Sequence, residues 1–451
     1  MKKLFYNFRL FNGKDNTLFS NKILLVNDGI FKNILDIHEI KKYPQYQLCD
    51  LNGLTVLPGL IDAHVHITNF QFTNPIKPPA CFQINKQRYL NLKTALKYGI
   101  TTVRDLGGFP NFIQQAKKRI QKGELTGPRI IACNSFITTE DGPPERYPKR
   151  LPKILVTLFG GQMAVRTKTS AEVRRAALEN IHQGVEFLKI HYTVKSAFYR
   201  GKLHNLSDES LRIIKDLADQ HHLQVAIHHQ ENAGFKKAIQ FGFNTVEHCS
   251  MEQLEKQDIE QFVQKKTALI PTLKIHYSPQ HPDEILDYLY SSEAREDFTN
   301  EALKQLITDI EQYTKKPYPP ADYQKKLYQD VEMSKKAWPI TLENVARIKK
   351  AGGIIGAGTD AFSSGLSPAR FYWKELECLT QAGFSNFEVL QMATIQNASI
   401  VGRKNELGSI EPNKYADFIT VNGNPLQKLV VLKCPTQVFL AGECVYDQKK
   451  D

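Results

Sequence analysis

The sequence has few of the features that mark secreted, membrane-spanning or disulfide-rich proteins. Its seven cysteines lie far apart, and no two of them are separated by only two residues. This spacing argues against a zinc ribbon or a disulfide framework and indicates a reducing compartment. No apolar stretch approaches the roughly 20 residues of a transmembrane helix. The N-terminal segment MKKLFYNFRLFNGKDN lacks the continuous apolar core of a signal peptide. We therefore expect a cytoplasmic protein with no membrane partner.

Long runs of one charge are also missing, although the chain is basic overall. It has 59 Lys and Arg residues against 47 Asp and Glu residues, a net charge of +12. The basic residues are scattered in short groups such as KKAIQ and RIKKAGG, without the basic run or arm typical of nucleic-acid binding. The charge gives at most a mild steering field for an anionic substrate. We expect a small-molecule substrate and no nucleic-acid partner, and the sequence leaves room for a homo-oligomer.

Both ends of the chain are predicted to be rich in β-strand. Residues 1–57 contain short alternating segments that break at NGKDN and NDG, which are typical of hairpin turns. Residues 403–451 contain similar short segments around NGNP and AGE. The simplest architecture joins these two ends into one small composite β domain, which flanks the middle of the chain (58–402).

The middle of the chain alternates short apolar strands with helix-like segments. Eight strands alternating with helices predict an α/β fold, a parallel sheet closed into a (β/α)8 barrel. The polar segment 276–345 is interpreted as a helical insertion around the seventh helix. The strands are expected at 53–67, 101–107, 128–137, 186–193, 224–230, 245–250, 268–273 and 354–361.

Ionisable residues gather near the carboxyl ends of five of these strands. The first strand ends in GLIDAHVHI, where His64 and His66 share a face because side chains alternate along a strand. Barrel enzymes build their active sites at the carboxyl ends of the strands. Ionisable groups inside a barrel are costly unless they are paired or bound to metal, so their convergence on one rim predicts a metal site. The other candidates are Lys189, His228 or His229, His248 and Asp360.

The chemistry of this set suits a divalent ion such as zinc. It offers imidazole nitrogen and carboxylate oxygen, whereas Cys249 follows His248 on the opposite face and is expected in the core. A protonated lysine cannot ligate a metal, so Lys189 would have to be carboxylated to a carbamate, which can bridge two ions. Taken singly, each residue also fits a packing, ion-pairing or turn-capping role. The prediction therefore depends on their joint placement.

Several motifs resemble those of the amidohydrolase superfamily of metal-dependent hydrolases, and the likeness covers nearly the whole chain. LPGLIDAHVHI resembles the first-strand HxH motif, and GITTVRDLGG resembles the second strand. GVEFLKIHYT is similar to the strand with the carboxylated lysine, GFNTVEHCS to the sixth strand and GAGTDA to the eighth. LGSIEPNKYADFITVNGNPL resembles the sheet-domain signature that follows. The subset that the chain most resembles is the imidazolonepropionase-like and prolidase-like group.

The resemblance implies a ligand set and a reaction. It favours His228 over His229, and it implies hydrolysis of an amide-type C–N bond, that of a dipeptide or an N-acyl amino acid. A hydroxide that bridges two ions would attack the carbonyl, and Asp360 would carry its proton to the leaving group. The implied cofactor is one or two divalent ions, with Zn²⁺ expected. The implied metal ligands are His64, His66, Lys189, His228, His248 and Asp360.

The chain also departs from the family pattern in its loops. The usual Gly-Gly-His-Gly run after the third strand is replaced by TTEDGPPERYP, so a typical substrate-side histidine is missing. Trp373 stands where members often have histidine. Asn413 replaces a glycine of the sheet domain, but Asn tolerates a left-handed turn, so we expect the turn to survive. Arg104, Tyr192 and Arg370 could hold a substrate carboxylate, although no motif assigns them that role.

Two alternatives remain open at this point. Glu231 lies three residues after His228, and mononuclear deaminases and imidazolonepropionases use an H-x-x-E of this kind with Glu as proton shuttle. In such a mononuclear cyclic amidohydrolase or deaminase, Lys189 would be an ordinary buried lysine. The second alternative is a barrel that has kept its fold and binds a ligand without catalysis.

Metal analysis separates these possibilities. If the site is binuclear, the purified protein holds about two divalent ions per chain, and Lys189→Ala abolishes both bridging and activity because the shared ligand is lost. Elemental analysis of both proteins measures this directly. A single ion, with activity that survives Lys189→Ala, would instead support the mononuclear alternative.

Overall fold

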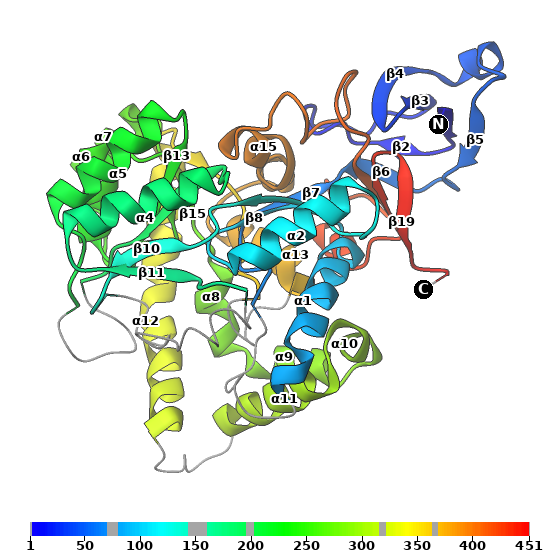
Figure 1. The fold of residues 1–451 in the computed structure, drawn as a ribbon. Helices are drawn as coiled ribbons and strands as arrows, with labels where there is room; N and C mark the ends of the chain where they lie inside the picture. The colour runs from blue at the N-terminus through cyan, green and yellow to red at the C-terminus, as the bar shows by residue number, and fades with distance from the viewer. Residues whose placement is uncertain are drawn as a thin grey trace.

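The computed structural model describes residues 2–69, 80–142, 160–194, 203–314, 322–362 and 369–450. Within these ranges the two chain ends lie together at one side of the barrel (Figure 1). No helix among the described residues combines the length and apolar character needed to cross a bilayer.

The chain ends form two sheets that pack face to face. The first sheet has the order β4-β3-β1-β5 and comes entirely from the N-terminal segment. The second, β19-β18-β17-β6-β2, places C-terminal strands beside N-terminal ones, with β17 antiparallel to β6. The expected composite β domain is therefore confirmed. Its strands are β1 (Lys2–Tyr6), β2 (Arg9–Leu10), β3 (Lys22–Asn27), β4 (Ile30–Asp36), β5 (Gln47–Asp50), β6 (Thr55–Pro58), β17 (Phe418–Val421), β18 (Gln437–Leu440) and β19 (Glu443–Asp447).

Aromatic side chains from both ends of the chain fill the space between the two sheets. The rings of Phe418 and Phe439 are stacked 4.3 Å apart, and Phe5 meets Phe418 edge-on at 5.1 Å. Phe31 completes the cluster. Burial of this aromatic cluster joins segments that are about 400 residues apart in sequence.

The turn at Asn413 survives as expected, with φ of 71°.

Eight parallel strands form the barrel, and all eight expected strands are present. The chain closes the barrel where Val65 pairs with Ala361 and where His66 N donates to Ala361 O at 2.9 Å. At the other junction, Glu186 N donates to Ala132 O at 3.1 Å. The strands are β7 (Leu60–Val65), β8 (Ile100–Asp105), β9 (Arg129–Ala132), β12 (Phe187–His191), β13 (Gln224–His228), β14 (Thr245–Glu247), β15 (Ala268–Ile270) and β16 (Ile354–Ile355).

Two short strands extend the barrel sheet beyond the eight. The third expected strand continues past a kink at Asn134, whose φ is 57°, into β10 (Phe136–Thr139). A further strand, β11 (Ala164–Thr167), runs parallel to β10 at the edge of the sheet and was not predicted. Three of its four residues are half-buried and one of these, Arg166, is charged, so the apolar pattern of a barrel strand is absent there.

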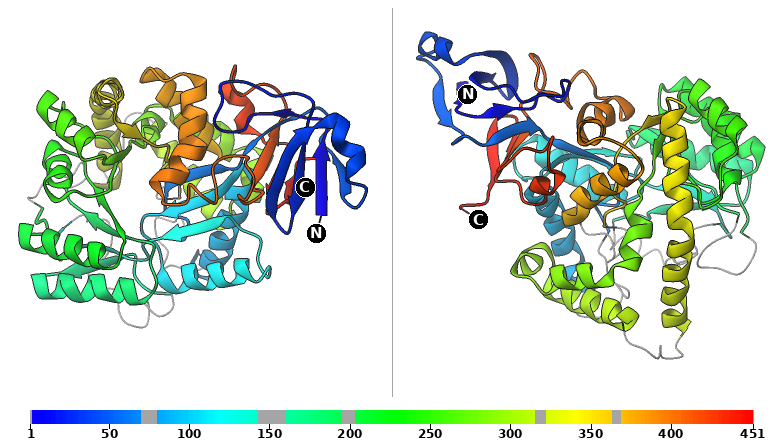
Figure 2. Two further views of the ribbon diagram at one scale, coloured as in Figure 1. Left: turned by 90° about the horizontal axis from the view of Figure 1, so that it is seen from above. Right: turned by 180° about the vertical axis from the view of Figure 1, so that it is seen from behind.

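Helices cover the barrel, as Figure 2 shows from above and behind. Before β12, Thr169 accepts a hydrogen bond from Glu172 N, and Gly184 follows the helix with φ of 74°. The surrounding helices are α1 (Ala80–Lys97), α2 (Pro110–Gln121), α4 (Ser170–His182), α5 (Asp208–Gln220), α6 (Asn232–Phe241), α7 (Lys256–Gln264), α13 (Tyr372–Gln381), α14 (Asn386–Gln391) and α15 (Asn397–Ile400), with a π-helical turn at Met392–Gln396. Short 3₁₀ segments lie at Ile37–Lys42, Ala369–Phe371 and Leu429–Lys433.

Additional helices follow β15, in the region where the sequence predicts an insertion. A buried carboxylate, Asp297, ties them to the barrel, because it accepts hydrogen bonds from Tyr98 Oη and Tyr288 Oη and pairs with Lys97. The helices are α8 (Lys274–Tyr277), α9 (Pro282–Leu289), α10 (Ser292–Asp297), α11 (Asn300–Thr314) and α12 (Asp322–Lys350), with a 3₁₀ segment at Ser278–Gln280.

The aromatic cluster makes a stability prediction. Phe418→Ala removes a fully buried ring that contacts Phe5 and Phe439, so the loss of transfer energy and the resulting cavity should cost about 3–5 kcal/mol. Denaturant unfolding measures this cost. Val430→Ala, at a side chain that is 51% exposed, is the control and should change stability by less than about 0.5 kcal/mol. A loss below about 1 kcal/mol in Phe418→Ala would contradict this role of the cluster.

Candidate metal centre

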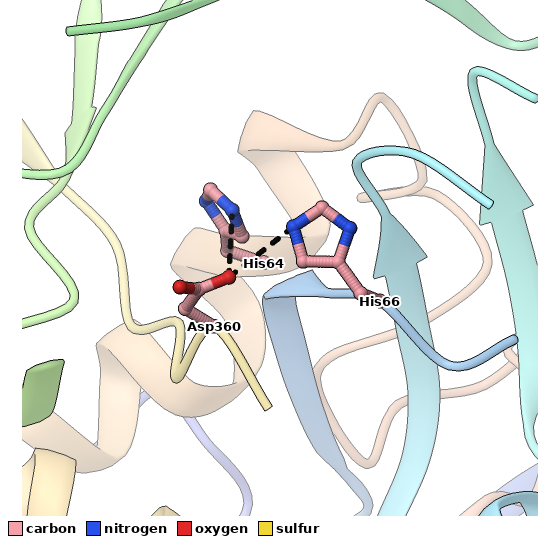
Figure 3. Close-up of side chains that lie close together, drawn as sticks. All are labelled: His64, His66 and Asp360. Carbon is pink, nitrogen blue, oxygen red and sulfur yellow. Dashed lines mark ion pairs between the residues drawn. The ribbon is translucent and has the colours of Figure 1, made fainter. Parts of the chain in front are cut away.

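Two histidines and an aspartate converge at the carboxyl end of the barrel (Figure 3). His66 Nε2 lies 3.2 Å from Asp360 Oδ1, and His64 Nε2 lies 3.6 Å from the same oxygen. One ligand atom from each of the three residues falls within 4.8 Å of the other two. His64 is buried, whereas His66 and Asp360 keep some exposure. The three side chains could therefore hold one ion that remains accessible from the mouth of the barrel.

The backbone leaves regular strand geometry where it presents these side chains. Asp360 has a φ of 53° and His248 a φ of 70°, which are left-handed values that non-glycine residues seldom adopt. Thr272, at the end of the neighbouring strand, has a φ of 46°. Such strain persists only where the surrounding structure enforces it, and it clusters at functional sites. Strand alternation is also broken in β7, whose register against β8 shifts between Asp62 and Val65.

Three histidines have their Nδ1 atoms engaged, which leaves Nε2 for a metal. His64 Nδ1 lies 2.8 Å from Glu247 Oε2, and His66 Nδ1 lies 2.8 Å from the carbonyl oxygen of Gly107. His248 Nδ1 lies 2.7 Å from Thr272 Oγ1. Because a carbonyl oxygen can only accept, His66 carries a proton on Nδ1, and its Nε2 is directed at Asp360. Partners of this kind fix the tautomer and orientation of metal-binding histidines.

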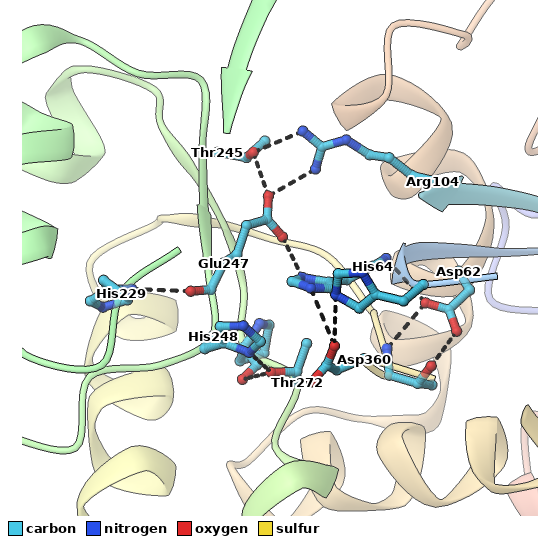
Figure 4. Close-up of polar contacts among 12 residues, drawn as sticks. Asp62, His64, Arg104, His229, Thr245, Glu247, His248, Thr272 and Asp360 are labelled. Atoms are coloured by element: carbon cyan, nitrogen blue, oxygen red, sulfur yellow. Dashed lines mark hydrogen bonds and ion pairs between the residues drawn. The ribbon is translucent and has the colours of Figure 1, made fainter. Parts of the chain in front are cut away.

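Glu247 is a central residue that the sequence analysis missed (Figure 4). Its carboxylate lies between the Arg104 guanidinium, with Nη1 2.9 Å from Oε1, and the His64 ring. Thr245 Oγ1 donates to the same Oε1 at 2.6 Å. Glu247 directly precedes His248, and the only signal in the sequence is a carboxylate beside a candidate ligand. Alternation would turn one of the two outward, but the left-handed backbone at His248 lets both contact interior groups.

Two further histidines, His248 and His228, lie next to the first cluster along the inside of the barrel. The ring of His248 lies 4.7 Å from that of His64 and 4.5 Å from that of His228. His229 is instead fully buried, packs against Phe235 and has Nδ1 3.1 Å from Glu247 O. The structure therefore brings His228, and not the ring of His229, to the other imidazoles.

Lys189 supplies the clearest test of whether a metal group fits. Its side chain is 1% exposed, and its Nζ has no hydrogen-bond partner in the part of the chain that the structure describes. Burial lowers the pKa of Lys189 to about 8, against the opposing effect of Glu247. An amine without a partner in this position is what carboxylation would use, because a buried lysine that loses its charge easily can react with carbon dioxide. The imidazole nitrogens and the Asp360 carboxylate are donors that suit a divalent ion.

Burial and nearby charges lower the pKa values of four other groups at the site. Burial holds the pKa values of His228 and His248 well below the usual range, so both rings are neutral donors. Burial alone would raise the pKa of Asp360, but His66 outweighs it and the carboxyl pKa is lowered. Similarly, Arg104 and His64 hold the pKa of Glu247 below its ordinary value despite burial. Neutral imidazoles and ionised carboxylates are the forms that bind metal.

Asp62 is buried behind the site. It accepts hydrogen bonds from His64 N at 3.1 Å and from Thr359 Oγ1 at 2.5 Å. It therefore links the backbones on either side of the barrel closure.

Cys249 lies in the core, as expected, with Sγ near Thr341 O.

The four other predicted residues lie in different surroundings. Glu231 is 5% exposed at the N-terminus of α6 and accepts from Val194 N at 3.2 Å. Arg104 is fully buried and donates to Glu247 and Thr245 inside the barrel, so its described contacts favour a structural role. Tyr192 packs against the main hydrophobic core, and Arg370 pairs with Glu293 over the Tyr288 ring. None of these described contacts assigns Tyr192 or Arg370 to a substrate, and that role stays a prediction.

A parallel barrel with a histidine–carboxylate cluster on its carboxyl rim is the architecture of a metal-dependent hydrolase. The model of the Amidohydrolase family matches residues 55–445, and the chain belongs to this family. It is thus an amidohydrolase, a hydrolase that acts on carbon–nitrogen bonds. This assignment removes the alternative of a barrel without catalysis.

The similarity to curated relatives and to solved structures extends over nearly the whole chain. Ochratoxinase from Aspergillus niger is 22% identical over 446 residues, which cover 93% of this chain and 81% of that protein. A Xaa-Pro dipeptidase with bound methionine in the active site has a TM-score of 0.74 at 22% identity, covering 99% of this chain and 100% of that one. A prolidase complexed with N-methylphosphonate-L-proline has a TM-score of 0.76 at 20% identity, with coverage of 99% and 100%. The fold is therefore that of known prolidases and amidohydrolases.

The position of Glu247 makes a stability prediction. Glu247→Gln leaves the Arg104 guanidinium buried without a counter-charge, so metal-free protein should lose about 3–5 kcal/mol. Denaturant unfolding after chelation measures the loss without a contribution from bound metal. The control is Glu260→Gln, at an exposed residue of α7, which should change stability by less than about 0.5 kcal/mol. Equal stabilities of the two variants would show that the buried ion pair does not hold the barrel together.

Proposed function

We propose that the protein is a binuclear amidohydrolase that cleaves the amide-type bond of a dipeptide or an N-acyl amino acid. The observation that carries the proposal is the buried Nζ of Lys189, which has no hydrogen-bond partner among the described residues. The charges of Glu247 and Asp360 act on this amine, so it lies within electrostatic reach of the histidine cluster. A carbamate on Nζ would turn this unsatisfied group into a ligand that two ions share.

Six residues would hold the ions. When bound, divalent ions act as Lewis acids on a carbonyl oxygen and lower the pKa of water enough to provide hydroxide at neutral pH. The protein contributes orientation, because Glu247, Gly107 and Thr272 fix the rings of three of the histidines. The six residues are His64, His66, Lys189, His228, His248 and Asp360.

Asp360 would move the proton during hydrolysis. Its carboxylate is ionised, because His66 lowers its pKa against the effect of burial, and it keeps some exposure toward the mouth. A carboxylate in this position can accept the proton of the attacking water on one oxygen. It can then donate that proton to the leaving nitrogen, which departs as an amine.

The proposed substrate class draws on the relatives. Two of the similar solved structures are a Xaa-Pro dipeptidase and a prolidase bound to N-methylphosphonate-L-proline. These names point to substrates with an amino acid on the leaving side of the scissile bond. The basic surface, with a net charge of +12, would favour the approach of a substrate carboxylate.

The alternative remains a mononuclear cyclic amidohydrolase or deaminase that uses Glu231. Two observations support this alternative. Glu231 is buried, and it directly precedes α6 shortly after β13. Its Oε2 already accepts from the backbone N–H of Val194. That contact suits a residue that holds the neighbouring loop, and so we rank the binuclear proposal first.

A substrate panel with two variants tests the proposal. Zinc-loaded protein should hydrolyse Xaa-Pro dipeptides or N-acetyl amino acids, and not lactones or cyclic ureas. Asp360→Asn should lower kcat by roughly 10²–10⁴-fold because the proton carrier is lost, whereas Glu231→Gln should keep kcat within about fivefold of wild type. Steady-state kinetics measures both. Turnover of cyclic substrates alone, together with a large loss in Glu231→Gln, would favour the mononuclear alternative.

A further inference from the structure

His191 is a buried imidazole that the proposed ligand set does not use. It is the last residue of β12 and follows Lys189 by two positions, so both side chains lie on the same face of the strand. The step of two residues along the strand moves its side chain toward the carboxyl end, where barrel enzymes admit their substrates. His191 pairs in register with His228 on the adjacent strand β13. It therefore belongs to the wall of the site on the mouth side of Lys189.

Aromatic rings cover both faces of His191 and fix its orientation. The ring of Phe136 lies 4.2 Å away at an interplanar angle of 28°. The ring of His228 lies 4.3 Å away at an angle of 5°. Only the edge of the imidazole, which carries the nitrogens, is left to make polar contacts.

Neither nitrogen of His191 has a partner among the described residues. Nδ1 is buried without a hydrogen bond, and no described side chain or backbone group bonds Nε2. The residue is only 7% exposed. An unsatisfied buried polar group costs free energy, and one that lies in the wall of a site can bind a ligand or water there.

The stacked geometry argues against His191 as a second ligand to the ion of His228. Two imidazoles that bind one ion must point their nitrogens at a common position about 2.0–2.1 Å from each. Rings that lie face to face within 5° of parallel direct their nitrogens side by side instead. A neutral imidazole offers one donor and one acceptor, and an amide group offers the complementary N–H and C=O.

We propose that His191 hydrogen-bonds the amide-type substrate next to the scissile bond, as a specificity-determining residue on the mouth side of Lys189. This inference rests on the proposed function, because it takes the substrate to be an amide. Among the described residues the imidazole edge has no polar partner, and the stack of Phe136 and His228 fixes its orientation toward an incoming amide.

Two substitutions at this position distinguish hydrogen bonding from packing. His191→Phe keeps an aromatic ring between Phe136 and His228 but removes both nitrogens. His191→Gln loses the ring but restores one donor and one acceptor. If His191 binds substrate, kcat/KM should fall at least about tenfold in His191→Phe and recover in part in His191→Gln. A packing role predicts the opposite order of the two variants.

Metal content and a binding probe complete the experiment. Both variants should keep the zinc content and thermal unfolding midpoint of wild type. In calorimetry, zinc-loaded His191→Phe should bind acetohydroxamic acid, a small amide analogue, at least about fivefold more weakly than wild type. The control is His276→Phe, which removes another buried imidazole. Its Nδ1 also has no partner among the residues described, and burial alone lowers its pKa. It should keep kcat/KM within about twofold of wild type.

The outcomes separate this inference from the proposed function. Failure of every amide in the panel would contradict the proposed function, while a weaker hydroxamate complex in His191→Phe would still support His191 as a binding group. Zinc loss in His191→Phe would make His191 a metal ligand and overturn the inference. Unchanged kcat/KM and hydroxamate affinity in His191→Phe, or an equal loss in His276→Phe, would overturn it as well.

Discussion

The rest of the site depends on the contacts that the Glu247 carboxylate makes. It is fully buried and lies between Arg104 of β8 and His64 at the end of β7. A buried carboxylate is tolerated only when it is paired and hydrogen-bonded, and here three partners satisfy it. In return, Glu247 fixes the tautomer of His64 and directs its Nε2 toward Asp360. One residue thus couples the stability of the barrel interior to the geometry of the candidate metal centre.

Close approach of the barrel strands is the second constraint. Asp360 N donates to His64 O at 2.8 Å, and a Cβ at Gly358 would lie 2.8 Å from His64 Cβ. Only glycine therefore fits between the eighth strand and the first. The left-handed backbone at Asp360 and at His248 then turns both side chains into the site. Such strain persists where the surrounding structure enforces it.

Much of the fold could be predicted from the sequence, because strand periodicity and turn residues are local signals. The eight barrel strands follow from short apolar runs separated by helix-like segments, and the joined chain ends follow from short alternating segments around NDG and NGNP. The histidines at the strand ends also carry a local signal. Strand β11 was missed, since its half-buried residues lack a clear apolar pattern.

The parts of the site that could not be predicted depend on contacts between distant strands. Glu247 and His191 gain their roles from partners on other strands, respectively Arg104 and Phe136. Arg104 looked available to a substrate, but the structure shows its guanidinium bonded to interior groups. Alternation also fails at His248, where a positive φ changes the direction of the side chain. Such features arise from tertiary packing, which no single segment of sequence encodes.

The central claim is that Lys189 completes a centre for two metal ions. A crystal structure of zinc-loaded protein, with anomalous scattering recorded at the zinc edge, tests it most directly. The account predicts two anomalous peaks, one beside His64 and His66 and one beside His228 and His248, with continuous density for a carboxylate on Lys189 Nζ. A single peak and an unmodified Lys189 amine would contradict it.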